Sequence, residues 1–147
     1  MAGILTGIVD GLFSSILSVA FYGSTIARLF QGVASTLVGP GAIDGGSGMT
    51  ALGILMHFGV AFAWTAVFAL LASRFQSIRR ALAKPGGPLA IATVYGPAIW
   101  MVMSLVVIPQ LTHRPATITY RWWIQLIGHI PFVALPIATI IGLPLRR

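Results

Sequence analysis

Three long stretches without a charged side chain constrain this sequence more than any other feature. They run from residue 45 to 73, from 85 to 112 and from 122 to 145. Each can cross the hydrocarbon core of a bilayer, which is about 30 Å thick and takes one helix of about 20 residues. A lipid interior offers no water to backbone groups, so such stretches must form helices. We therefore predict membrane helices near residues 49–72, 88–108 and 121–144.

The N-terminal stretch, residues 1–22, is interrupted by a single charge, Asp10. It lacks the basic region that begins a cleavable signal sequence, so we expect a retained first span near residues 3–22. Composition agrees, because 57% of the 147 residues are hydrophobic and 7% are charged, against roughly 25% charged in soluble domains. The sequence predicts one all-α integral membrane domain, residues 1–147, with four transmembrane helices.

Residues 24–38, between the first two spans, follow a helical period. One side of the helical wheel is polar and holds Ser24, Arg28, Gln31 and Ser35, whereas the opposite side is apolar and holds Ile26, Leu29, Phe30, Val33 and Leu37. This pattern predicts an amphipathic helix that lies in the membrane interface. The alternative is that the segment extends the first span. The glycine-rich residues 39–48 then form a loop.

Basic residues predict the orientation, because short cytoplasmic loops are enriched in lysine and arginine. Four bases lie in residues 74–87 and two end the chain, whereas Arg28, Arg114 and Arg121 lie on the other side. We expect residues 74–87 to form a cytoplasmic basic loop, with both termini cytoplasmic in a bacterial inner membrane. The net charge is +7. Because the basic residues flank apolar runs, we expect them to contact anionic lipid headgroups and not nucleic acid.

Small residues repeat along one side of the first span, namely Gly3, Gly7, Gly11, Ser14 and Ser18. Such a stripe lets another helix approach closely, so we predict a helix-packing face. Asp10 lies on the same side, about 10 Å from the inner end at 1.5 Å per residue. With Tyr95, also placed in the inner half, it is a candidate proton or ion site. The alternative is a neutral hydrogen-bond donor between helices.

His57 and His129 lie at a similar predicted depth, about 12 Å from the outer ends of the second and fourth spans. Diagonally opposed spans would point both rings at the bundle centre. Two such imidazoles could ligate haem b or a (bacterio)chlorophyll. Alternatively, each histidine bonds a backbone carbonyl that Pro131 or Pro136 leaves free, or both join Asp10 and Tyr95 in a proton relay.

The sequence contains no recognisable set of catalytic residues. The chain has no cysteine, and its two acids, Asp10 and Asp44, are predicted near opposite membrane faces, so no acid–base pair can share a substrate. No His-Glu-x-x-His run or serine nucleophile motif occurs. We expect neither an enzyme nor a metal site.

From about Gly53 onward the chain resembles the YagU-like family of small bacterial inner-membrane proteins. The resemblance rests on Met56-His57-Phe58, Phe62, a basic turn, a third span ending near Pro109, Gly128-His129 and Arg146-Arg147. It covers about two thirds of the sequence and implies multi-pass inner-membrane placement, without catalytic residues. Family members are longer between the first two spans.

Three functional hypotheses follow. The packing stripe and the lack of a catalytic set favour a non-catalytic accessory or structural subunit that packs against itself or other membrane subunits. The histidine pair suggests a subunit that binds haem or chlorophyll through His57 and His129. The intramembrane carboxyl suggests a small proton-coupled transporter that uses Asp10.

Overall fold

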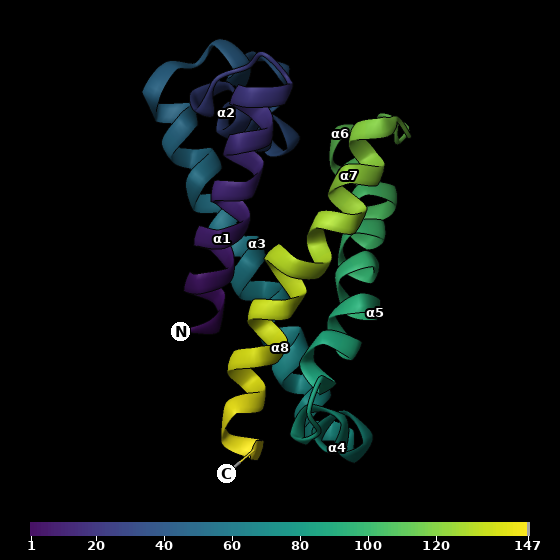
Figure 1. Ribbon diagram of the computed structural model, residues 1–147. Coiled ribbons are helices and arrows are strands. Elements are labelled where there is room, and N and C mark those ends of the chain that lie inside the picture. Colours follow the sequence, from purple (N-terminus) through teal and green to yellow (C-terminus); the bar gives the residue numbers. More distant parts are fainter. Residues whose placement is uncertain (147) are drawn as a thin grey trace.

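The computed structural model describes residues 1–146, and within that range it consists of helices and turns (Figure 1). Four segments are long and apolar enough to cross a membrane: Ala2–Phe21, Gly46–Arg74, Gly87–Thr112 and Tyr120–Leu145. The predicted all-α membrane class with four spans is therefore confirmed, and the span ends lie within a few residues of those expected. Arg147 and the side chain of Arg146, both counted in the predicted orientation, lie outside the described part.

Three of the four spans contain a five-residue π-helical turn. The first span is α1 (Ala2–Ile16) followed by the π turn Leu17–Phe21. The third is α5 (Gly87–Val102), the π turn Met103–Val107 and α6 (Ile108–Thr112). The fourth is α7 (Tyr120–His129), the π turn Ile130–Ala134, α8 (Leu135–Gly142) and a last turn, Leu143–Arg146. Only the second span, α3 (Gly46–Arg74), is one unbroken α-helix.

The π turn of the fourth span contains Pro131, which has no N–H to donate to the carbonyl of Ile127. The N–H of Ile130 donates to that carbonyl instead. The helix thus continues past the proline without leaving the carbonyl unpaired, as a segment in lipid requires. π turns are rare in proteins overall, and those that occur often lie at functional sites.

The helix α2 (Ile26–Val38) forms where an amphipathic helix was predicted, and the Thr25 hydroxyl caps it by accepting from the N–H of Arg28 at 3.1 Å. Its buried side only partly follows the apolar side of the wheel. Phe30, from the apolar side, is buried, but so is Gln31 from the polar side, which donates to the carbonyl of Gly46 at 3.1 Å, while Leu37, from the apolar side, is 60% exposed. The physical reason is that α2 packs directly on α3, where Gly53 touches the backbone of Phe30.

The spans do not form the square bundle in which the second and fourth are diagonal, because α3 contacts α8, whereas α3 and α5, neighbours in such a bundle, pack less closely. The fourth span packs against α1, at α8 and the π turn before it, and against α5, while α1 also packs against α3. At one end of the molecule lies α4 (Gln76–Ala83), and at the opposite end lie α2 and the connection between α6 and α7 (Figure 1). These two ends are called the α4 end and the α2 end below.

A core of side chains closes the α4 end, formed by Phe68, Ala72, Leu82, Ile99, Val133, Ile137 and Ala138. On its surface the Arg79 guanidinium donates to the carbonyls of Ala72 at 2.9 Å and Ser73 at 2.8 Å. These are carbonyls of the last turn of α3, which have no partner within the helix. Arg79 therefore joins α4 to the end of α3.

Candidate functional site

A carboxyl group and an imidazole meet where α1 packs on α3. Asp10 Oδ2 lies 3.9 Å from His57 Nδ1, and His57 Nε2 lies 2.9 Å from the carbonyl oxygen of Gly7. A carbonyl only accepts, so Nε2 is the donor in this contact, and the neutral ring leaves Nδ1 unprotonated beside Asp10. Both side chains are mostly buried, with exposed fractions of 14% for His57 and 19% for Asp10.

The glycine stripe of α1 makes this contact possible. A Cβ added at Gly3 would collide with the ring of Phe62, and one added at Gly7 with the ring of Phe58. At Gly11 it would lie 3.3 Å from His57 Nε2. Ser18 is also buried and Ser14 is half-buried. The glycine positions of the predicted packing face thus lie against α3 of the same chain, which places His57 over the α1 backbone.

His129, the last residue of α7, approaches Asp10 from the fourth span. It is 8% exposed, its Nδ1 donates to the carbonyl of Gln125 at 2.7 Å, and its ring centroid is 5.0 Å from that of Trp100. Asp10 interacts electrostatically with both His129 and His57. Its Oδ1 is buried without a hydrogen-bond partner among the described residues, as is the hydroxyl of Thr6 one turn away. The carboxyl therefore has two imidazole neighbours and unused hydrogen-bonding capacity.

Asp10 and Tyr95, expected together in the inner half, are not brought together. The Tyr95 hydroxyl donates to the carbonyl of Trp64 at 2.7 Å, and its ring packs on Phe68 at the α4 end. Asp10 lies at the level of His57 instead, because α1 begins well above the C-terminus and α4 (Figure 1). Counting residues from the start of α1 therefore misjudged the depth of the carboxyl.

Both histidines bond backbone carbonyls, those of Gly7 and Gln125. Neither is a carbonyl that Pro131 or Pro136 leaves free, so the expected reason for these bonds is wrong. Haem ligation by two histidines requires a ring nitrogen with a free lone pair on each, directed across a shared gap. Each ring donates through one nitrogen to a backbone carbonyl and keeps a lone pair on the other, so these bonds alone are compatible with ligation. The free nitrogen of His57, Nδ1, faces the Asp10 carboxyl at 3.9 Å instead of an open gap. Residues 1–146 hold no group of three His, Asp or Glu side chains suited to a metal ion.

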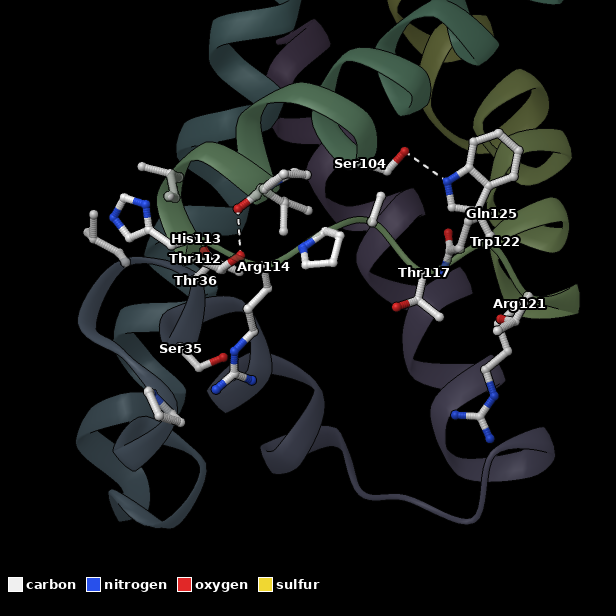
Figure 2. Close-up of a pocket in the computed structure, with 18 of the residues that line it drawn as sticks. Ser35, Thr36, Ser104, Thr112, His113, Arg114, Thr117, Arg121, Trp122 and Gln125 are labelled. Carbon is white, nitrogen blue, oxygen red and sulfur yellow. Dashed lines mark hydrogen bonds between the residues drawn. The ribbon is translucent and has the colours of Figure 1, made fainter.

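A cavity of about 790 Å³ opens at the α2 end (Figure 2). Its walls are the last residues of α2, the end of the third span, the connection from Thr112 to Thr119, and the start of α7. Its deeper wall includes Trp122, whose indole N–H donates to the Ser104 hydroxyl at 2.9 Å, a bond drawn in Figure 2. The Ser104 hydroxyl in turn donates to the carbonyl of Trp100 at 2.7 Å.

Two residues connect the cavity to the group formed by Asp10, His57 and His129, called the Asp10 cluster below. Trp100 and Gln125 line the cavity, and both also contact His129, through the indole ring and the backbone carbonyl respectively. One layer of side chains therefore separates the cavity from the cluster. Arg121, Gln125 and His129 are spaced by four residues along the fourth span and lead from the cavity to the cluster. The cavity itself depends on how α2 and α6 are placed, which the sequence does not reveal.

Comparisons with protein family models, with curated proteins and with solved structures find no match. The resemblance to the YagU-like family is therefore untested and stays a prediction.

Proposed function

We propose that this protein is a small proton-coupled membrane transporter in which Asp10, flanked by His57 and His129, binds and releases the coupling proton. The observation that carries the proposal is the position of this carboxyl, 3.9 Å from His57 Nδ1 and within electrostatic range of His129, inside apolar spans and beneath a cavity. Ionisable groups are costly within a bilayer, and those that occur there mark proton and ion pathways. Titratable groups a few ångströms apart can pass a proton directly or through one water.

The two ends of the molecule support a transport cycle. The cavity reaches to within one layer of the cluster from the α2 end, whereas the core around Phe68, Leu82 and Ile137 fills the α4 end. Access from one side combined with closure on the other is what alternating access needs. The π turns in three spans supply places where helices can change their hydrogen bonding.

We assign the α2 end to the outside. The basic residues Arg74, Arg79, Arg80 and Lys84 lie around α4, and the positive-inside rule places such a loop in the cytoplasm. With this orientation we propose a bacterial inner membrane as the location, with both termini cytoplasmic. The same orientation makes the cavity accessible to the external medium, from which an inward proton gradient would load the cluster.

Other hypotheses receive less support from the geometry. The glycine positions of the stripe that suggested an accessory subunit lie against α3 of the same chain, so these glycines leave no face that calls for a partner. The free ring nitrogen of His57 that a tetrapyrrole would need faces the Asp10 carboxyl at 3.9 Å. Proton coupling would use Asp10, His57 and His129 in the positions that they already occupy.

Proteoliposomes test the proposal. The purified chain is reconstituted with a pH-sensitive dye inside the vesicles, an acid-outside gradient is imposed, and a panel of small organic anions and cations is added outside. We expect substrate-dependent acidification of the lumen with the wild type and none with Asp10→Asn. Asp44→Asn is the matched control, because Asp44 is the other acid of the chain and is exposed in a pair with Arg28. Equal acidification by wild type and Asp10→Asn would refute the proposal.

A further inference from the structure

We infer that the cavity at the α2 end binds a small organic anion with an apolar body, and that the Arg114 guanidinium is its principal charged contact. This inference rests on the proposed function in so far as it names a substrate class for it. The binding itself depends only on the cavity and can be measured without transport.

The charge of the cavity is positive and uncompensated. The chain has two acidic residues, of which Asp10 faces the histidines and Asp44 lies 3.7 Å from Arg28. Arg114 and Arg121 line the cavity, and no acid does. Clefts lined by charges of one sign between low-dielectric walls concentrate ions of the opposite sign. The cavity therefore attracts anions.

Arg114 and Arg121 differ in how much of their hydrogen-bonding capacity is already used. The Arg121 guanidinium lies 4.2 Å from the centroid of the Tyr22 ring, and its Nε donates to the Tyr120 hydroxyl at 3.2 Å. The Arg114 guanidinium has no hydrogen-bond or ion-pair partner within residues 1–146. Figure 2 shows it extended toward Ser35 of α2, across the cavity mouth from Arg121. All five of its N–H groups remain to bind a ligand, and guanidinium matches the planar geometry of a carboxylate.

The remaining polar groups of the wall are of two kinds. Four hydroxyls already give their hydrogens to carbonyls of their own helices, those of Ser35, Thr36, Ser104 and Thr112, so they can only accept from a ligand. The side chains of Thr117 and Gln125 have no such partner in the described chain, and neither has the indole N–H of Trp100. The unpaired groups that only donate are the Arg114 guanidinium and this indole. The charged end of a matching ligand therefore accepts hydrogen bonds, whereas its body can carry a donor for the hydroxyls.

The volume of the cavity and its apolar walls indicate the size and the uncharged part of the ligand. About 790 Å³ lies within the range of sites that enclose drug-sized molecules. Trp100, Trp122, Leu37 and Ile108 line it beside the polar groups. Aromatic walls next to a guanidinium suit an anion with a ring or short hydrocarbon body. A free carboxylate from the medium and the phosphate headgroup of a lipid both offer this chemistry.

Calorimetric titration tests the inference with the whole chain in nanodiscs of phosphatidylcholine, at one pH on both sides and with empty nanodiscs as the baseline. The probe is 1-naphthoate, and the neutral 1-naphthamide is its matched analogue. We expect saturable binding of naphthoate that weakens by about tenfold to a hundredfold in Arg114→Gln, the usual loss for a hydrogen bond to a charged group. Arg28→Gln, at the same end but outside the cavity, should bind as the wild type does.

A second series contains phosphatidylglycerol in the nanodiscs. If naphthoate affinity falls as this lipid increases, the site takes a lipid headgroup, and if it does not, the site takes an anion from the medium. Equal naphthoate binding by wild type and Arg114→Gln, or equal binding of naphthoate and naphthamide, would overturn the inference. Asp10→Asn should bind naphthoate normally. Normal transport by Asp10→Asn would refute proton coupling at Asp10 and leave the anion site standing.

Discussion

Gly96 on α5 is the position where a single methyl group should most directly disturb the candidate site. A Cβ placed there would lie 2.6 Å from the carbonyl oxygen of His129, 2.7 Å from its carbonyl carbon and 2.9 Å from the nitrogen of Ile130. Ordinary contact begins at 3.4 Å, so Gly96→Ala requires α5 and α7 to separate by about 0.8 Å at this point. All three atoms are backbone, so no side-chain rotation can relieve the overlap.

The expected cost follows from two opposing effects. Overpacking of this kind costs about 1–3 kcal/mol, while alanine in place of glycine within a helix contributes about 0.5–1 kcal/mol of stability. We expect Gly96→Ala to lower the free energy of unfolding by about 1 kcal/mol, the difference between the midpoints of these two ranges. Unfolding in mixed micelles of dodecyl maltoside and increasing SDS, followed by tryptophan fluorescence and circular dichroism, measures this change.

Gly59→Ala is the matched control, because Gly59 lies inside α3 and a Cβ there meets no atom within 4 Å. We expect this variant to equal the wild type or to exceed it slightly. If Gly96→Ala proves as stable as Gly59→Ala, the close approach of α5 to the backbone of His129 does not exist. The placement of His129 beside Asp10 would then lose its structural basis.

Two further predictions concern single hydrogen bonds and use the same unfolding assay. Ser104→Ala should lower the free energy of unfolding by about 1–3 kcal/mol, because it leaves the buried indole N–H of Trp122 unpaired, and an unchanged midpoint would contradict the bond. Arg79→Gln should cost about 0.5–1.5 kcal/mol by removing its bonds to the end of α3. Arg80→Gln, which removes a neighbouring charge without such bonds, should cost less, and equal losses would count against the cap.

The spans could be predicted because each depends on one local property. A charge inside hydrocarbon is costly, so the gap from Asp44 to Arg74 and the gap from Lys84 to Arg114 bound the second and third spans within a few residues. The glycine period of α1 likewise predicted a packing face. It could not identify the partner, because Gly7 is compatible with any helix that presents a suitable side chain, and in the structure that side chain is Phe58 of α3.

The candidate site depends on which helices are neighbours and how deep each begins, and neither is a local property. His57 and His129 were expected to face each other, but α1 approaches both, and Asp10 joins them. Tyr95 was grouped with Asp10 by counted depth, yet it lies in the core near Phe68. Such errors arise because residue counting assumes that every span starts at the same membrane plane.

The amphipathic helix shows a similar limit at smaller scale. The period of residues 24–38 predicted a helix, and α2 forms there. The burial of Gln31 was not predictable from the wheel, because it depends on the carbonyl of Gly46, which accepts the side-chain N–H. A single tertiary hydrogen bond thus allows this polar side chain to be buried.

The π turns give three of the spans a property that α3 lacks. A π turn is an α-helix that holds one extra residue, accommodated by widening the ring of hydrogen bonds at that place. Loss of one residue within Leu17–Phe21, Met103–Val107 or Ile130–Ala134 would return the helix to its regular pitch while its two flanks kept their facing. The same loss within α3 would rotate every following side chain by about 100°. His57 and Gly53, which hold the cluster and α2 in place, thus belong to the one span that cannot vary in length without losing its partners.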